Sequence, residues 1–383
     1  MVSPTGPQLL SFFQSLEPQM IQWLVELTNQ DTPSTSKPAL DALSKELAGR
    51  FSEFGAQVEI LTASNAGDHL IARFGHGLEG KKQLLLLGHL DTVWDVGEAR
   101  KRPARIEDGK LFGPGALDMR GGLTLLLALG NFLSFNADQL TRPITILLVS
   151  DEETGSHSSR PYIESEGRQS DAALVLEPSL PGGALKTSRK GVGVFRITAR
   201  GVAAHAGVDF ERGASAIEEI SRQIQELYSL IEPSRGITVN VGTICGGTRS
   251  NVVADFAEIE VDVRVPSAAE GVRLTRQIFE LLPRNPSVRL EIQGGINRPP
   301  LERSDRIVNL FKQARILASD LGIDLREGST GGGSDGCFTA AIGVPTLDGL
   351  GPEGDGPHAL HEHVLLSSLV PRAALLTQLV LRL

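Results

Sequence analysis

Short apolar runs that end in charged side chains set the tightest limit on how this sequence can fold. Four leucines lead into His89, an ITILLV run leads into Glu152, and an ALVL run leads directly into Glu177. Strands that are apolar on both faces are typical of a sheet covered by helices on both sides. Open α/β sheets bind ligands beyond the carboxyl ends of their strands. We therefore expect an α/β domain with a site along one edge of its sheet.

A change of pattern near residue 190 divides the chain. Before it, apolar runs alternate with stretches of helical periodicity. After it, strands of period two and two amphipathic helices follow in the order β-α-β-β-α-β over residues 190–298, which is typical of a ferredoxin-like domain. We predict an α/β domain of residues 1–189 and 299–383, with a mostly parallel sheet covered by helices on both faces. The ferredoxin-like α+β domain is inserted into it.

The composition of the chain limits which binding partners and which cellular compartment are expected. The 383 residues suffice for two or three domains, and the net charge of −9 comes without a basic block, so nucleic acid is not an expected partner. Cys245 and Cys337 lie far apart and form no disulfide framework, which fits a reducing compartment. The N-terminus has no basic segment of a signal peptide, and no apolar run has transmembrane length. We expect a cytoplasmic protein that does not bind membranes.

Histidines and acidic residues at the strand ends and in two loops point to a metal site. A buried carboxylate without a partner is costly, so several at one edge need a common cause. A divalent metal supplies one, and two metals account for five ligands better than one, since a carboxylate can bridge ions about 3.5–4 Å apart. Mixed ligation suits zinc, with cobalt or manganese as replacements. The residues at these positions are His89, Asp91, Asp118, Glu152, Glu153, Glu177 and His358.

Eight motifs give the sequence a family resemblance over nearly its whole length. In order they are GHLDTV, GPGALDMRGG, SDEETGS, LEP, AHAG, NVVADFAEIEVDVR, GGGSDG and GPHALHE. The sequence resembles the co-catalytic dizinc aminoacylases and carboxypeptidases of metallopeptidase family 20. It is similar to acetylornithine deacetylases and succinyl-diaminopimelate desuccinylases, and it looks most like bacterial glutamate carboxypeptidases. The resemblance implies two Zn²⁺ per subunit and a homodimer in which the inserted domain acts in dimerisation and as a lid.

The same resemblance assigns roles to the residues at the strand ends. It divides the ligands between two zinc ions: His89 and Glu177 on one, Glu153 and His358 on the other, with Asp118 bridging both. Asp91 is similar to the acid that orients the ligating histidine through its free ring N–H. Glu152 resembles the general base, which takes a proton from the metal-bridging water and passes it to the departing amine. The peptide bond from Asp118 to Met119 is expected to be cis.

The remaining histidines near these motifs need a choice. His361 and His363 compete with His358 for the role of ligand, and His358 is preferred because it follows Gly-Pro and precedes Glu362 as in the family pattern. The other histidines are interpreted as loop or surface residues: His69, His76 and His157.

The substrate contacts that the resemblance implies lie mainly in the inserted domain. His205 is similar to the histidine that stabilises the oxyanion in the partner subunit's site, although it can also simply tie down its own loop. Asn251 and Arg264 match positions that contact the substrate and its carboxylate, and Arg298 adds charge. For each arginine, a surface salt bridge is the alternative. The GGGSDG segment resembles a loop that offers backbone N–H groups to that carboxylate, or it is a plain turn; its candidates are Gly332, Gly333 and Ser334.

The sequence thus predicts a zinc-dependent hydrolase that cleaves the amide bond to a C-terminal amino acid, with glutamate as the expected residue. The alternative within the class is a deacylase of N-acyl amino acids such as acetylornithine or succinyl-diaminopimelate. An alternative of another class is a metal-free binding protein on the same fold, but every expected ligand and the base are present. A serine hydrolase is disfavoured because no GxSxG elbow occurs.

Overall fold

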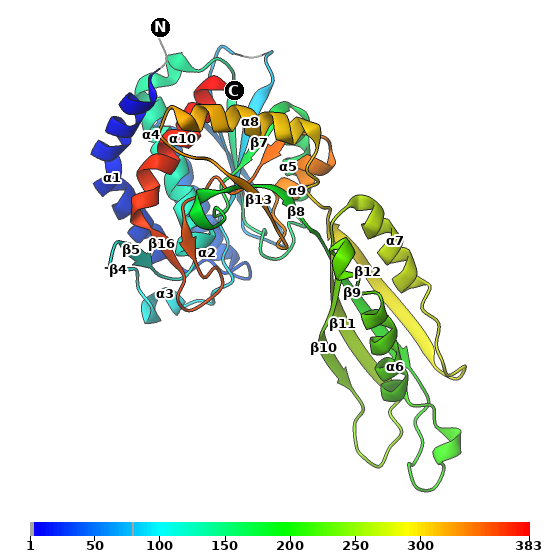
Figure 1. Ribbon diagram of the computed structural model, residues 1–383. Coiled ribbons are helices and arrows are strands. Elements are labelled where there is room, and N and C mark those ends of the chain that lie inside the picture. Colours follow the sequence, from blue (N-terminus) through cyan, green and yellow to red (C-terminus); the bar gives the residue numbers. More distant parts are fainter. Residues whose placement is uncertain (1–3, 79) are drawn as a thin grey trace. The chain divides into compact units, whose positions relative to one another are not determined.

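The computed structural model describes residues 4–78 and 80–383, which form two compact units (Figure 1). The first unit comprises the chain up to Ser188, together with Arg303–Ser329 and Ser334–Leu383. The second comprises Arg189–Glu302 and the four residues Thr330–Gly333. The glycine-rich loop at 331–333, which the sequence analysis assigned to the α/β domain, therefore groups with the second unit.

The first unit is built on a six-stranded sheet. Its strand order is β1 (Gln57–Leu61), β2 (His69–Phe74), β6 (Ile144–Val149), β3 (Gln83–His89), β7 (Ser170–Val175) and β14 (Thr346–Leu347). Strands β6, β3, β7 and β14 pair in parallel, while β2 is antiparallel to both β1 and β6. The central strands β3 and β6 are buried along their whole length, as their apolar runs predict.

Helices cover both faces of this sheet. On one face, Leu85 and Leu87 of β3 share a buried cluster with Ile163 of α5 (Arg160–Arg168) and Phe338 of α9 (Gly336–Ala341). On the other face, α1 (Gly6–Thr28), α4 (Gly121–Asn136) and α10 (Leu369–Arg382) pack against one another (Figure 1). The predicted α/β class, with a mostly parallel sheet between helices, is confirmed.

The remaining elements of the first unit are shorter or peripheral. They are α2 (Lys37–Glu53), α3 (Glu98–Lys101), α8 (Asp305–Ser319), the strand pair β8 (Leu185–Arg189) with β13 (Glu327–Thr330), and a small sheet of β4 (Arg105–Glu107), β5 (Lys110–Phe112), β16 (His363–Leu365) and β15 (Gly354–Asp355).

Two close approaches bring the start of α4 onto the ends of the strands. A Cβ atom on Gly122 would lie 2.2 Å from the carbonyl oxygen of Leu176, so only glycine fits there. A Cβ atom on Gly88 would lie 2.9 Å from Met119 Cε, and the N–H of His89 lies 3.1 Å from Met119 Sδ. The turn that precedes α4 therefore sits directly beside the ends of β3 and β7.

The second unit has the predicted β-α-β-β-α-β order. Its elements are β9 (Gly191–Arg200), α6 (Ala216–Ser229), β10 (Thr238–Gly246), β11 (Phe256–Val265), α7 (Ala268–Phe279) and β12 (Arg289–Arg298). The sheet order is β10-β11-β9-β12, and all three pairs are antiparallel. Phe195, Val261 and Leu274 belong to a core that joins the sheet to its helices. This is the ferredoxin-like arrangement, and that prediction is also confirmed.

Within residues 4–78 and 80–383, no helix combines the length and the apolar character that crossing a membrane requires.

Candidate metal centre

His89 ends strand β3 with its two ring nitrogens in different surroundings. Nδ1 lies 3.0 Å from the backbone oxygen of Asp91 and 3.4 Å from its Oδ1. Nε2 lies 3.1 Å from Asp118 Oδ1 and 3.6 Å from Glu177 Oε1. Complete burial by itself lowers the pKa of His89, but the hydrogen bonds to Asp118 and Asp91 outweigh it and raise the pKa well above its usual value. The Asp91 side fixes the Nδ1 proton, so Nε2 is the nitrogen available to a metal.

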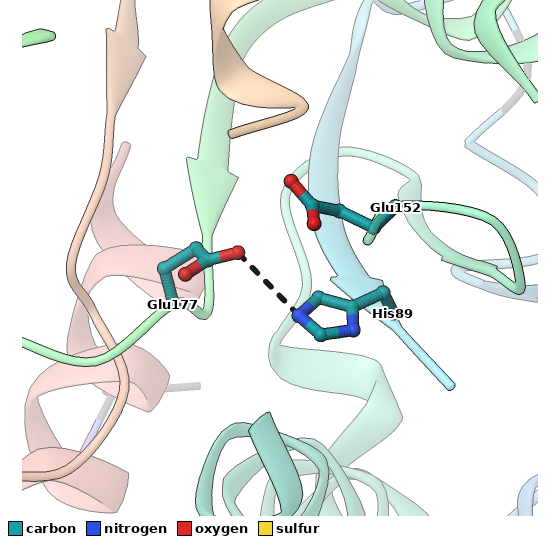
Figure 2. A group of neighbouring side chains, drawn as sticks. All are labelled: His89, Glu152 and Glu177. Carbon is teal, nitrogen blue, oxygen red and sulfur yellow. Dashed lines mark ion pairs between the residues drawn. The ribbon is translucent and has the colours of Figure 1, made fainter. Parts of the chain in front are cut away.

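Residues from three neighbouring strand ends converge on this imidazole. Figure 2 shows His89 at the end of β3, with Glu152 from the loop after β6 and Glu177 from the segment after β7. Each of the three offers a ligand atom, and these atoms lie within 4.8 Å of one another. A second group, His89 with Asp118 and Glu153, meets the same limit. His89 thus belongs to both groups.

Asp118 lies between two histidines. Its Oδ1 is 3.1 Å from His89 Nε2 and its Oδ2 is 3.3 Å from His358 Nε2, which is also 3.3 Å from Glu153 Oε1. Burial would raise the pKa of Asp118, but the hydrogen bonds from His358 and His89 prevail and lower it. The carboxylates of Asp118 and Glu153 in turn raise the pKa of His358 to about 10. The Asp118 carboxylate therefore presents one oxygen to His89 and the other to His358, as a ligand that bridges two metal ions must.

Asp91 organises more of the site than the sequence analysis assigned to it. Its carboxylate is fully buried and accepts hydrogen bonds from the Ser34 hydroxyl at 2.7 Å and from the N–H groups of Glu152 at 3.2 Å and Glu153 at 3.0 Å. Burial would raise the pKa of Asp91, but the hydrogen bond from His89 outweighs it and the pKa is lowered. The same side chain therefore fixes His89 and the adjacent pair of glutamates.

Glu362 holds the Asp118 turn, a role that sequence reasoning missed. Its carboxylate is 1% exposed and accepts the backbone N–H groups of Gly115 at 2.9 Å, Leu117 at 3.0 Å and Asp118 at 2.9 Å. A fourth donor, the indole N–H of Trp94, lies at 3.1 Å. The sequence used Glu362 only as a marker for choosing His358, and nothing in it pointed to Trp94.

The turn itself has the expected backbone. The Asp118–Met119 peptide bond is cis, as the resemblance predicted. The next residue, Arg120, is 1% exposed and donates to the carbonyl oxygen of Leu90 at 3.0 Å and to the hydroxyl of Thr32. Burial lowers the pKa of Arg120 to about 10, so the guanidinium stays charged at neutral pH. Arg120 thereby ties the turn to the residue between His89 and Asp91.

The C-terminal histidines separate clearly. His358 makes the ion pairs described above, from a backbone with φ of +62°. His361 is exposed and lies 3.9 Å from Asp355, while His363 is buried against Phe112 with ring centroids 5.0 Å apart.

Of the three histidines interpreted as loop or surface residues, one is buried. His76 and His157 are exposed, as predicted. The prediction for His69 is wrong, because this residue begins β2 and is 0% exposed. The residues just before His69 are polar or small, and they give no indication that β2 pairs with the interior strand β6.

In the second unit, two predicted substrate residues lie on adjacent segments. His205 is exposed, and its Nδ1 accepts the N–H of Gly207 at 3.1 Å. The N–H of Ala206 donates to the carbonyl oxygen of Asn251 at 3.0 Å. The second unit therefore brings His205 and Asn251 together, although they are far apart in the sequence.

Three arginines surround the glycine loop within the second unit. Arg264 donates to both carboxylate oxygens of Asp262 at 2.8 Å and to the carbonyl oxygen of Gly331 at 3.3 Å. Arg298 is buried, and its Cδ would lie 2.7 Å from a Cβ atom on Gly333. The third is Arg189, which sequence reasoning missed: it is buried and donates to the carbonyl oxygens of Gly332 and Gly333 at 3.1 and 2.7 Å.

Ser334, whose backbone N–H is the group that the resemblance proposes for the substrate carboxylate, belongs to the first unit. It is 0% exposed, and its hydroxyl donates to Asp348 Oδ2 at 2.5 Å. Its side chain therefore fastens the end of the loop.

Comparisons with known proteins agree with the fold and with the family resemblance. A family model of "Peptidase family M20/M25/M40" matches residues 85–382. The chain is 27% identical to carboxypeptidase G2 of Pseudomonas sp. strain RS-16 over 368 residues, which covers 93% of this chain and 87% of that protein. It is 31% identical to the acetylornithine deacetylase of Salmonella arizonae over 257 residues, which covers 61% of this chain and 64% of the deacetylase.

Solved structures show the same fold. Aminopeptidase PepT from Bacillus cereus matches with a TM-score of 0.78 at 21% identity, covering 95% of this chain and 98% of that one. The YXEP protein of Bacillus subtilis, described as a dinuclear metal binding peptidase, matches with a TM-score of 0.71 at 15% identity, covering 96% and 98%. At these identities the likeness concerns the fold alone.

Proposed function

The chain belongs to the peptidase family M20/M25/M40, and on that premise we propose that it is a two-zinc hydrolase of amide bonds to a C-terminal amino acid, with glutamate as that residue. The observation that carries the proposal is the position of Asp118. Its two carboxylate oxygens face His89 and His358, and each histidine also lies within 3.6 Å of a glutamate oxygen.

The donor set fits divalent cations. Four carboxylates gather around two histidines, which leaves an excess of negative charge in a largely buried site. In addition, Glu153 Oε1 is buried and lies 3.3 Å from His358 Nε2, but it accepts no well-aligned hydrogen bond among the described residues. Mixed histidine and carboxylate ligation suits zinc. The proposed ligands are His89 and Glu177 for one zinc ion, His358 and Glu153 for the other, and Asp118 for both.

The residues of the chain then have separate tasks. Bound zinc would supply Lewis-acid polarisation of the scissile carbonyl. Glu152, whose N–H is held by Asp91, accepts a proton from the attacking water and returns it to the departing amine. Because Glu152 also lies in one candidate ligand group with His89 and Glu177, ligation is the alternative role, and metal content after substitution separates the two.

The preference for glutamate rests on two supports. The match to carboxypeptidase G2 extends over 93% of the chain, and Arg264 and Arg298 lie beside the glycine loop, where a guanidinium fork would suit a substrate carboxylate. Arg264 is held by Asp262 in this structure, so a substrate carboxylate would have to share that guanidinium. The 31% identity to acetylornithine deacetylase favours an N-acyl amino acid deacylase as the second candidate.

We also propose that the second unit mediates a homodimer and acts as a lid. In that arrangement His205 stabilises the oxyanion in the partner subunit's site, and Asn251 on the adjacent segment contacts the same substrate. The exposure of both residues in the isolated chain is compatible with this role.

The deciding experiment combines metal analysis with a substrate panel. The purified protein is assayed for bound metal and for amine release from N-acyl glutamates, dipeptides, N-acetylornithine and N-succinyl-diaminopimelate, with and without a chelator. Chelator-sensitive release of glutamate supports the proposal. A higher kcat/KM on N-acetylornithine establishes the deacylase instead. A protein that binds these compounds with no metal and no turnover is a binding protein.

A further inference from the structure

His69 and the residues bonded to it form a cluster beside the loop that carries Glu152 and Glu153, and they are separate from the proposed metal ligands. His69 begins β2, and its neighbour Leu70 pairs with Leu148 of β6, so the imidazole lies beside the point where β6 ends. The side chain is 0% exposed. A buried histidine must have partners for both ring nitrogens, and those partners indicate what it does.

The hydrogen bonds of His69 form one continuous chain. Nδ1 accepts the backbone N–H of Ser150 at 3.1 Å. Because an amide N–H can only donate, the ring proton is assigned to Nε2, which lies 3.0 Å from Ser158 Oγ and donates to it. The Ser158 hydroxyl then donates to Asp151 Oδ2 at 2.8 Å, and the same oxygen accepts the N–H of Ser158 at 2.7 Å.

This chain closes the loop that carries Glu152 and Glu153. Ser150 precedes the loop at 151–158 and Ser158 ends it, so the two nitrogens of one imidazole hold both of its ends. Inside the loop, the carbonyl oxygen of Asp151 accepts the N–H of Ser156 at 2.7 Å. Asp91 holds the glutamate N–H groups, and His69 holds the ends of the same loop from β2.

We propose that His69, acting through Ser158 and Asp151, is a positioning residue that fixes the loop of Glu152 and Glu153 for hydrolysis, an inference that rests on the proposed function. Among the described residues, the imidazole is hydrogen-bonded to Ser150 and Ser158 and not to a proposed metal ligand, so its role is to determine where the two carboxylates lie. Outer residues of this kind typically change metal affinity or activity about 10–100-fold when replaced. Displacements of about 1 Å at a catalytic group can have effects of the same size.

Three substitutions dissect the chain of bonds. In His69→Asn the amide oxygen can still accept from Ser150, but the link to Ser158 is lost. In His69→Gln the amide group reaches Ser158, but the acceptor for Ser150 is lost. Ser158→Ala removes the hydroxyl and keeps the backbone N–H that binds Asp151. With saturating Zn²⁺, each is expected to lower kcat about 10–100-fold while KM changes by less than about 3-fold.

A coupling measurement distinguishes this chain from general destabilisation. Ser158→Ala should lower kcat in the wild type and in His69→Gln, but have little further effect in His69→Asn, where the link is already broken. The matched control is Glu166→Gln, which weakens a part-buried ion pair, 2.8 Å long and outside the loop, between Glu166 of α5 and Arg73, which lies in the same strand as His69. This control should lower Tm and leave kcat within about 2-fold, since surface and core pairs away from a site change stability alone.

Cobalt supplies a readout that is independent of turnover. The visible absorption of bound Co²⁺ reports ligand geometry, and it should shift in His69→Asn and Ser158→Ala but not in Glu166→Gln. If His69→Asn and Ser158→Ala are folded and keep the wild-type spectrum and kcat, the inference is overturned, and it is equally overturned if Glu166→Gln lowers kcat as much. If the wild type binds no Co²⁺ and hydrolyses none of the panel, the proposed function itself fails, and this inference with it.

Discussion

Replacing Glu362 by glutamine should weaken the metal centre without touching a ligand. The carboxylate oxygens divide four donors between them: Oε1 takes the N–H groups of Leu117 and Asp118, and Oε2 takes those of Gly115 and Trp94. Glutamine keeps one oxygen and turns the other position into an NH₂ donor, so two N–H groups then face a donor.

The size of the effect follows from those bonds. Each hydrogen bond to a charged group contributes about 1.5–3 kcal/mol, so two lost bonds amount to about 3–6 kcal/mol. The indole of Trp94 is half-buried, so its N–H can bond to water when it loses its acceptor. The NH₂ group should therefore replace Oε2, the oxygen that Trp94 shares with Gly115. We then expect the free energy of unfolding to fall by about 3 kcal/mol. Because the turn carries Asp118, we also expect about 10–100-fold weaker metal binding.

The assay has two parts and a graded control. Urea unfolding of the metal-free protein measures stability, and competition with a chromophoric chelator measures Zn²⁺ affinity. Trp94→Phe removes one of the four donors, keeps the carboxylate and retains a ring beneath Arg102, whose guanidinium carbon lies 4.3 Å from the Trp94 ring centroid. It should cost about 1 kcal/mol and change zinc affinity little.

A particular result would refute this reasoning. If Glu362→Gln binds both metals with wild-type affinity, the carboxylate does not determine the position of Asp118, whatever happens to stability. If Trp94→Phe and Glu362→Gln lose equal affinity, the indole and not the carboxylate is decisive.

Four further expectations test the site. Glu152→Gln should keep both metals and lower kcat about 10²–10⁴-fold; near-native turnover would exclude its role as general base. In the metal-free protein, the carboxylates of Asp118 and Glu153 raise the pKa of His358 to about 10, so His358 is protonated at pH 7, and hydrogen bonds to Asp118 and Asp91 raise the pKa of His89 as well. Metal uptake should therefore release at least the proton of His358, and metal affinity should fall as pH falls; calorimetry without any dependence on buffer ionisation would contradict this. Arg264→Ala should reduce kcat/KM on free-acid substrates far more than on amidated analogues, whereas an equal loss on both marks a structural arginine. His205→Ala mixed with Glu152→Ala should recover activity towards about a quarter of wild type as subunits exchange, and flat activity despite exchange would rule out action across the dimer.

The sequence alone was sufficient for the features that depend on neighbours along the chain. An apolar run such as the one before His89 specifies a strand buried on both faces, because its consecutive apolar side chains point alternately to the two faces of the sheet. Since parallel strands end at one edge, the residues that follow them had to meet, and their chemistry pointed to metal. The order β-α-β-β-α-β of the second unit could likewise be predicted from the periodicity of apolar residues, which is about two in the strands and about 3.6 in the helices.

Other features depended on partners that lie far away in the sequence. His69 is separated by 89 residues from Ser158, and Glu362 by 247 from Gly115 and 268 from Trp94. Arg189 meets Gly332 across 143 residues. In the sequence each of these is an isolated polar residue with the pattern of a surface position. Their roles were decided only when folding removed water from around them, because a buried polar group must then take its hydrogen bonds from whichever chain segment the fold has placed beside it.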